Sequence, residues 1–316
     1  MRNIIKSNFV PPLRLILTNR CNGLCPFCHK EGYQGNSDMV WQDICTCANT
    51  AEELALPNIT LTGGEPTLRA DLPDIISELQ KRYSGHISLT TNGYNLEQTA
   101  ESLQIPLYAV NLSVSSFSQN LWRKYQNVLP GKAIKSLLAV PAIKKKFNIV
   151  ITKDNYQEIK DIISFCVSNS ISLDIMFELK EYNTEDLLIQ KFILTFFSKL
   201  GEPTIHYGPT PSLTIEINDT CKISIKHPTL SSLVKWDICC RCKVIPECFE
   251  RVCAVRVYPN GTVTPCLNHS VIADKGDQKE LKDRIYDAYD VLGKCEVFHI
   301  AEEKLILNNT FCLIHV

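Results

Sequence analysis

The 316-residue chain lacks several features that would assign it to a class at once. No stretch approaches the ~18 consecutive apolar residues of a membrane span, and residues 1 to 12 lack the apolar core of a secretory signal peptide. Charge of neither sign is in excess, since 33 Lys and Arg stand against 34 Asp and Glu, so no overall basic field favours nucleic acid or a membrane surface. We therefore expect a cytoplasmic protein whose partners include no nucleic acid and no membrane.

Cysteine, in contrast, is abundant, with 15 in the chain. An odd number of thiols without a secretory signal fits metal binding better than a disulfide framework. Three of them, Cys21, Cys25 and Cys28, lie within eight residues in "LTNRCNGLCPFCHKEG". A structural zinc site needs four protein ligands, whereas an iron-sulfur cluster held by three thiolates leaves one iron open to an added ligand. The triad predicts such an open [4Fe-4S] cluster, with a zinc knuckle or buried structural thiols as the alternatives.

Six short apolar runs alternate with amphipathic segments such as "DLPDIISELQKRY", which predicts βα units around a parallel sheet with both faces buried. The expected strands are residues 13–17, 58–62, 86–90, 108–114, 147–152 and 173–179. Six units favour an α/β fold with a partial (β/α)6 barrel of the TIM type, whose chemistry lies at the carboxyl ends of the strands. Between these strands, the run Lys144 to Lys146 is expected to be a solvated helix end.

The last third of the chain has a different pattern. The segments "SLTIEIN" and "CKISIKH" predict a hairpin that opens a second, smaller α+β domain, which gives domains of residues 1–210 and 211–316. In "VRVYPNGTVTPC" the turn residues Pro and Gly predict a three-residue hairpin loop with Tyr258 opposite Thr262 and Arg256 opposite Thr264. The tail from residue 270 is charged and helical in pattern.

A second group of cysteines surrounds that hairpin. Strand alternation puts Cys253 on the face of Val255 and Val257, which predicts a core residue. The four remaining thiolates would complete a closed [4Fe-4S] cluster, with zinc as the alternative: Cys239, Cys242, Cys248 and Cys266. Cys240 could replace Cys239. The default for Cys45, Cys47, Cys166 and Cys221 is a buried structural thiol, and Cys295 and Cys312 are unassigned.

The stretch "TGGEPTLR", residues 62–69, follows the second expected strand beside the cysteine loop that follows the first. With both motifs in order, the chain resembles the radical S-adenosylmethionine (SAM) enzymes, which carry a C-x3-C-x2-C loop and a G-G-E-P stretch at these places. The resemblance implies that SAM chelates the open iron and is cleaved by one electron to methionine and a 5'-deoxyadenosyl radical. It also implies the cofactor-binding residues, from adenine to amine to ribose and carboxylate: Phe27, Gly63, Gly64, Glu65, Thr90, Asn92 and Ser113.

Within that superfamily the chain is most similar to the GTP 3',8-cyclases of molybdenum-cofactor biosynthesis, and the second cysteine group resembles the auxiliary-cluster domains of the cyclases and of SPASM-type peptide maturases. Arg14 and Arg69 match substrate-binding positions of the cyclases. Ala254 and Asp174 stand where basic residues are expected, which makes GTP doubtful as the substrate. Arg256 shares a hairpin face with Cys266 and is our candidate catalytic residue, as an anion contact for substrate, with an exposed cross-strand residue as the alternative.

These observations predict a radical SAM enzyme that takes hydrogen from a nucleotide-like or natural-product small molecule to form a bond or rearrange it. A ribosomal peptide maturase is the alternative, although only 20 residues precede the first motif, which leaves no room for an N-terminal leader-binding domain. A genuine GTP cyclase and a non-catalytic scaffold are less favoured. An electron donor such as flavodoxin or ferredoxin is the expected protein partner.

Overall fold

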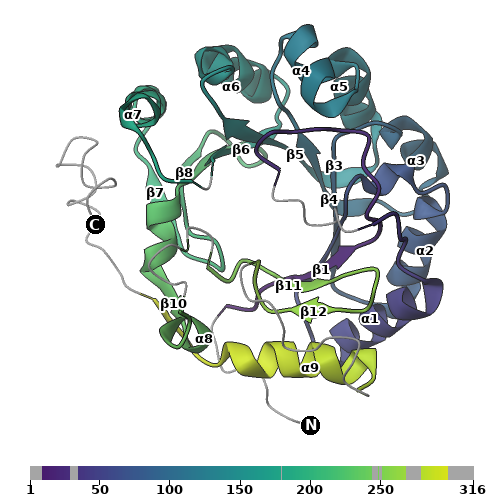
Figure 1. Cartoon of the computed structure of the whole chain (residues 1–316). Helices are drawn as coiled ribbons and strands as arrows, with labels where there is room; N and C mark the ends of the chain where they lie inside the picture. The colour runs from purple at the N-terminus through teal and green to yellow at the C-terminus, as the bar shows by residue number, and fades with distance from the viewer. Residues whose placement is uncertain are drawn as a thin grey trace.

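The computed structural model describes residues 9–28, 35–178, 180–243, 248, 251–267 and 279–297. One sheet of eleven strands curves around a central space, with helices along its outer face (Figure 1). The strand order is β12-β11-β1-β2-β3-β4-β5-β6-β9-β8-β7. The α/β class and the partial barrel predicted from the sequence are confirmed.

The strands of this sheet are β1 (Leu13–Ile16), β2 (Asn58–Thr62), β3 (His86–Thr91), β4 (Leu107–Ser113), β5 (Ala142–Ile151), β6 (Ser172–Phe177), β7 (Thr204–His206), β8 (Ser212–Glu216), β9 (Lys222–Lys226), β11 (Val255–Val257) and β12 (Val263–Thr264). A separate antiparallel pair is formed by β10 (Val234–Trp236) and β13 (Cys295–Val297). The α-helices are α1 (Trp41–Glu53), α2 (Leu72–Arg82), α3 (Leu96–Ser102), α4 (Gln119–Gln126), α5 (Pro130–Ala139), α6 (Ile159–Ser168), α7 (Thr184–Phe197), α8 (Asp237–Cys240) and α9 (Leu281–Leu292). Three 3-10 turns are η1 (Pro66–Leu68), η2 (Tyr156–Glu158) and η3 (Pro228–Leu233).

The helices form where the sequence has a helical apolar period and suitable ends. In α2, Pro73 lies in the first turn, Ile75 and Leu79 face the core, and Lys81 and Arg82 lie in the last turn, where cations stabilise the helix dipole. Long membrane-spanning helices are not found: within the described residues, none is both long and apolar enough to cross a bilayer.

The two faces of the barrel strands differ in chemistry. Outward-facing Leu61 and Leu89 are fully buried against the helices, whereas Thr60, Thr90 and Asn111 point inward and line a cavity. The inner face of these strands is therefore polar and the outer face apolar. A (β/α)8 barrel fills its interior with branched apolar side chains, so a polar interior indicates a space for a ligand and not a packed core.

Strand β5 also departs from the expectation. It begins at Ala142, five residues before the expected strand, and the run Lys144 to Lys146 lies inside it and not at a helix end. All three lysines are among the residues that line the cavity, and the Lys145 ammonium donates to the Leu138 carbonyl of α5. Lysine has a low strand propensity, but alternate positions of a strand that borders a polar cavity can carry it.

The hairpin predicted after residue 211 is present as β8 and β9, but it continues the barrel sheet. Strand β9 pairs in parallel with β6, with Leu173 opposite Ile223 and Ile175 opposite Ile225. The hydrogen-bonded sheet thus runs through the expected boundary, and the division at residue 210 stays a prediction.

The other edge of the sheet is formed by a hairpin from the C-terminal part of the chain. The β11–β12 hairpin has the predicted register, with Arg256 opposite Thr264, and β11 pairs in parallel with β1. Gly261 supplies the positive φ of +79° that the turn requires. Of the tail expected to be helical from residue 270, the structure describes residues 279–297, which contain α9 and β13, and α9 covers the hairpin. Arg284 of α9 donates to the Gly261 carbonyl at 2.6 Å, and Tyr289 donates to the Pro11 carbonyl at 3.0 Å.

Candidate cluster and substrate site

The three-cysteine loop follows β1 and is supported from two sides. On one side, the Gly64 amide donates to the Thr18 carbonyl at 2.7 Å and the Glu65 amide donates to the Arg20 carbonyl at 2.8 Å. On the other side, the C-terminal turn of α4 accepts from the loop, with the Leu24 amide 2.6 Å from the Tyr125 carbonyl. The loop is therefore positioned by backbone hydrogen bonds from β2 and α4.

The glycine pair is needed for this support. A Cβ on Gly63 would lie 2.6 Å from the Thr18 carbonyl oxygen, and a Cβ on Gly64 would lie 2.1 Å from the Arg20 carbonyl oxygen. Gly63 also has a φ of +153°. The close approach that these two glycines permit is thus made, in this structure, by the backbone of the cysteine loop itself. Recognition of a SAM amine by Gly63, Gly64 and Glu65 stays a prediction.

The three thiols form a donor set that favours a bound cation. Cys21 and Cys25 are half-buried and Cys28 is exposed. Burial raises the pKa of both half-buried thiols, for Cys25 to about 12, and the neighbouring thiols act in the same direction. Thiolates this close together are costly without a metal, because the thiolate is the ligand form and iron would stabilise it.

Among the described residues, no three His, Cys, Asp or Glu side chains are close enough to ligate one metal ion. Each thiolate of a [4Fe-4S] cluster binds a different iron, so its sulfurs need not converge on one point. The arrangement is therefore compatible with a cluster, and its ligation by Cys21, Cys25 and Cys28 stays a prediction.

Glu65 organises the carboxyl ends of β2 and β3. Its buried carboxylate caps η1 by accepting from the Thr67 amide at 3.0 Å, and it accepts from the Asn92 amide at 2.6 Å and the Thr91 hydroxyl at 2.5 Å. Burial nevertheless raises the pKa of Glu65 above its usual range, and the hydrogen bonds oppose that shift. In this structure Glu65 positions the strand ends beneath the cysteine loop.

The other expected SAM contacts form a polar chain next to the loop. Asn92 donates to the Asn22 side chain at 2.9 Å, and Asn22 donates to the Gln126 carbonyl at 2.8 Å. Gln126 in turn donates to the Ser113 carbonyl at 2.9 Å. This chain links the ends of β3 and β4 to the cysteine loop, which is where the resemblance puts the ribose and carboxylate of SAM. Direct contacts of Asn92 and Ser113 with SAM stay predictions.

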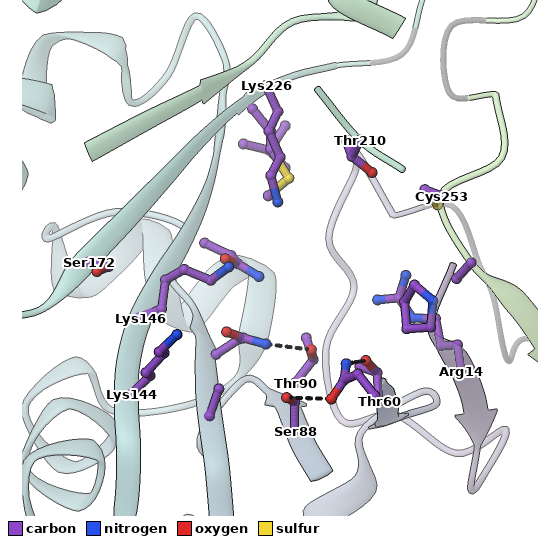
Figure 2. A pocket seen from close by; sticks show the side chains of 18 of the residues that line it. Arg14, Thr60, Ser88, Thr90, Lys144, Lys146, Ser172, Thr210, Lys226 and Cys253 are labelled. Atoms are coloured by element: carbon purple, nitrogen blue, oxygen red, sulfur yellow. Dashed lines mark hydrogen bonds between the residues drawn. The ribbon is translucent and has the colours of Figure 1, made fainter. Parts of the chain in front are cut away.

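A cavity of about 560 Å³ occupies the barrel interior (Figure 2). Phe27 lines it beside the cysteine loop, in edge-to-face contact with Tyr125 at 6.1 Å between ring centres, and Thr90 lines it from β3. Figure 2 shows Lys144, Lys146 and Lys226 on one side of this space and Arg14 on the other.

Of the two arginines expected to bind substrate, the structure supports one position only. Arg14 lines the cavity. Arg69 is not among the lining residues, and its guanidinium is used within the protein: Nη1 donates to the Leu17 and Met39 carbonyls, while Nε and Nη2 pair with Asp71. In this structure the donors of Arg69 hold the segments that flank the cysteine loop, and a contact of Arg69 with substrate stays a prediction.

Asp174, the acidic residue noted as a departure from the cyclases, is buried and forms ion pairs with Lys146 and Lys226, each 2.6 Å from its Oδ2. Burial opposes ionisation, but the two ammonium groups hold the pKa of this carboxyl well below its usual range. Sequence reasoning missed Lys146 and Lys226. The signal was available as alternation, since Lys144, Lys146, Asn148 and Val150 share one face of β5.

The structure brings some cysteines of the second group close to one another. Burial raises the pKa of Cys239, with smaller contributions from the nearby Cys248 and Cys242. Cys266 is buried beside the end of β12. Cys240 is exposed, and its thiol donates to the Trp236 carbonyl at 3.6 Å. A four-thiolate cluster at Cys239, Cys242, Cys248 and Cys266 stays a prediction.

For the hairpin, one prediction is corrected and one alternative is excluded. Cys253 is not a core residue: it is half-buried and lines the cavity, because β11 begins two residues later and strand alternation does not extend to it. Arg256 is fully buried, so it is not the exposed residue considered as an alternative. Its Nη2 donates to the Cys253 thiol at 3.2 Å. A direct contact of Arg256 with substrate stays a prediction.

The remaining cysteines mostly match the default. Cys47, Cys166 and Cys221 are buried, Cys45 is half-buried, and Cys295 in β13 is half-buried. Cys312 lies outside the described residues.

Comparison with known proteins agrees with this site. The family described as "Radical SAM superfamily" matches residues 15–166. The protein named "Probable GTP 3',8-cyclase" from Methanocaldococcus jannaschii is 35% identical over 163 residues, which are 49% of this chain and 54% of that protein. A protein of the same name from Sulfurisphaera tokodaii is 31% identical over 217 residues, 63% of this chain and 69% of that protein. The chain spans about half the length of most curated relatives it matches.

Among solved structures, SuiB of Streptococcus suis bound to its precursor peptide SuiA has a similar fold, with a TM-score of 0.63 and 18% identity over 88% of this chain and 65% of SuiB. The cysteine loop, the Gly-Gly-Glu segment packed against it and the polar barrel cavity agree with these matches. The chain belongs to the radical SAM superfamily.

Proposed function

We propose that the chain binds SAM at a [4Fe-4S] cluster on Cys21, Cys25 and Cys28 and removes a hydrogen atom from a small molecule held in the barrel cavity. When bound, the cluster and SAM supply the electron and the carbon-centred radical that do the difficult chemistry. The chain's own residues hold the loop, shape the cavity and bind the substrate.

The cavity is the observation that carries this proposal. Its volume of about 560 Å³ falls in the range of small-molecule sites, roughly 300 to 1,000 Å³. It is lined along the whole of one face of β5, from Val150 near the carboxyl end to Lys144 near the amino end. Six residues of strand rise correspond to about 20 Å. A substrate can therefore lie with its reacting end near Phe27 and its other end among the lysines.

Each group beside the cavity has a definable task. Glu65 and the Asn22–Asn92 contact hold the ends of β2 and β3 against the cysteine loop. The Tyr125 hydroxyl donates to Asp154 at 2.6 Å, which fixes the ring that contacts Phe27. Arg14, Lys144, Lys146 and Lys226 provide cationic groups for the substrate. The cavity thus separates a reacting end from a binding end.

A peptide maturase is the second candidate, and the observation that favours it is the fold shared with SuiB, solved with a precursor peptide. A peptide would place one side chain in the cavity, and only an acidic side chain or a terminal carboxylate would use the lysines. A genuine GTP 3',8-cyclase is third, because Asp174 stands where the cyclases are expected to carry a basic residue, although Lys146 and Lys226 lie beside it.

The setting we propose is the cytoplasm, with an electron donor such as flavodoxin or ferredoxin. The expected clusters need cysteine thiols that are not oxidised to disulfides, and a reducing compartment keeps thiols in that form. The proposed second cluster, near Cys239 and Cys248, would lie on the hairpin side of the cavity, where Cys253 lines it.

The test is anaerobic reconstitution with iron, sulfide, reductant and SAM, with 5'-deoxyadenosine and methionine measured by mass spectrometry. The wild-type chain should form both, and the triple Cys21→Ala, Cys25→Ala, Cys28→Ala variant should form neither. The triple Cys47→Ala, Cys166→Ala, Cys221→Ala variant removes an equal number of thiols, all of them buried and outside the loop, and is the control, which should stay active. If the first variant still produces 5'-deoxyadenosine, the proposal fails.

A further inference from the structure

Three strands bring one carboxylate and two ammonium groups together inside the cavity. Lys146 comes from β5, Asp174 from β6 and Lys226 from β9, and these strands are neighbours in the sheet. Both Nζ atoms lie 2.6 Å from the same oxygen, Oδ2 of Asp174. Two cations are therefore held next to each other by one anion, and the three groups together carry a net charge of one positive unit.

The exposure of the three side chains is unequal. The Asp174 side chain is 8% exposed, whereas those of Lys146 and Lys226 are 28% and 30% exposed. Both lysines line the cavity, and Asp174 is not among the lining residues. The carboxylate thus lies behind the two ammonium groups, which face the space that a ligand would enter.

The rest of the cavity wall adds positive charge. Arg14 and Lys144 also line it, whereas Glu178, near the carboxyl end of β6, is the carboxylate found among the described lining residues. His227 follows Lys226 and lines the cavity too, but burial lowers the pKa of its imidazole to about 4, so it is neutral near pH 7. The potential at the two lysines therefore favours a negatively charged ligand group.

An ion triad of this kind is an unusual choice for stability alone. A buried ion pair gains little over apolar residues of the same volume, since the desolvation cost offsets the attraction. A lysine ammonium has three N–H donors, so it can bind the buried carboxylate with one and a ligand in the cavity with another. Three strands that pair in register hold the geometry without a loop, as a recognition site requires.

We propose that Lys146 and Lys226 bind one compact anionic group of the substrate, a carboxylate or a single phosphate, and that Asp174 is the specificity-determining residue that excludes a polyphosphate there. The inference rests on the proposed function, since it concerns the substrate of the same cavity. With Asp174 present, the triad has one net positive charge. A ligand group with one negative charge neutralises it, and a group with two negative charges exceeds it by one. A triphosphate brings roughly four negative charges to a site that already contains a carboxylate, so that carboxylate repels it.

The experiment measures anion binding and needs no turnover. Inorganic phosphate, acetate and tripolyphosphate are titrated by calorimetry into the reconstituted full-length chain at low salt. Wild type should bind phosphate or acetate, and Lys146→Met and Lys226→Met should each weaken that binding at least tenfold. Asp174→Asn should increase the affinity for tripolyphosphate at least tenfold. Whether phosphate or acetate binds more tightly identifies the anionic group.

The matched control is Glu216→Gln. Glu216 lies in β8 and pairs with Lys222 of β9 on the protein surface, so its change also removes one negative charge and one lysine ion pair. It should leave all three affinities within twofold of wild type. A Lys226→Arg variant, which keeps the charge, should retain phosphate or acetate binding. Circular dichroism verifies that each variant is folded, and if Asp174→Asn is unfolded the two lysine variants decide.

Two results would overturn the inference. One is phosphate and acetate affinity unchanged in both lysine variants, and the other is tripolyphosphate binding by Asp174→Asn no tighter than by Glu216→Gln. Failure here is distinguishable from failure of the proposed function, because formation of 5'-deoxyadenosine by wild type is measured separately and does not depend on these anions.

Discussion

Replacement of Gly64 by alanine tests the close contact that positions the cysteine loop. The added Cβ would lie 2.1 Å from the Arg20 carbonyl oxygen and 2.5 Å from the Arg20 carbonyl carbon. Both atoms belong to the backbone, so no side-chain rotation relieves the clash. The loop must move away, and with it go the Gly64–Thr18 and Glu65–Arg20 backbone hydrogen bonds.

The size of the effect follows from those two losses. Two backbone hydrogen bonds contribute about 1 to 3 kcal/mol together, and overpacking at a tight contact costs about 1 to 3 kcal/mol. The native loop position is thus disfavoured by at least about 2 kcal/mol, which is a factor of roughly 30 in its population. Because the thiolates must be in place to hold the cluster, the initial rate of 5'-deoxyadenosine formation should fall 30-fold or more.

The assay compares Gly64→Ala with Gly131→Ala after identical reconstitution. Gly131 lies in α5, where a Cβ would meet nothing within 4 Å, and alanine is favoured over glycine in a helix by about 1 kcal/mol. That control should keep its activity and melt at a temperature no lower than wild type. Activity of Gly64→Ala within twofold of Gly131→Ala would refute the reasoning, since it would mean that the loop position does not depend on this contact.

Three further predictions concern other parts of the site. In the triple variant of Cys21, Cys25 and Cys28, iron analysis should find about four iron atoms per chain if a second [4Fe-4S] cluster is present. A further Cys248→Ala change should remove most of this iron, whereas Cys253→Ala should keep it. Iron that is retained without Cys248 would argue against Cys248 as a ligand. Because burial lowers the pKa of His227 to about 4, the unfolded chain binds a proton near pH 6.5 that the folded chain does not, so stability falls as the pH falls. Between pH 7.5 and 5.0 wild type should lose about 2 kcal/mol of unfolding free energy relative to His227→Phe in urea titrations, and equal losses in both chains would contradict the assigned burial. Finally, the reconstituted chain should not convert GTP to a cyclised purine nucleotide, and product above a no-enzyme control would show that Asp174 and Ala254 do not exclude it.

The sequence was most informative where a pattern depends on nearby residues. Strand β2 has the predicted bounds of residues 58–62, because its apolar run is short and followed at once by the glycine pair. The hairpin register at Arg256 and Thr264 is confirmed, since Pro259 and Gly261 determine the turn that sets it. These features need only local rules of backbone conformation.

The errors arose where distant parts of the chain determine the environment. Alternation places Lys144 and Lys146 on one face of a strand, but it does not indicate that this face borders a cavity, because the other walls come from distant parts of the chain. The hydrogen bonds of Arg69 to the Leu17 and Met39 carbonyls could not be predicted either, because both residues lie far from it in the chain. Pairing between β9 and β6 was hidden for the same reason, because alternation predicts a hairpin and not the strand beside it.

The parallel pairing of β11 with β1 has a consequence for the order in which the molecule can be completed. The strand that leads into the cysteine loop is flanked on one side by β2, some 40 residues later in the chain, and on the other by Val255–Val257, some 240 residues later. During synthesis from the ribosome, the hydrogen-bonding groups on that second side of β1 stay without their strand partner until most of the polypeptide has been made. Cys21, Cys25 and Cys28 are therefore translated early, but β1, the strand that leads into their loop, acquires its second neighbour only when most of the chain has been made.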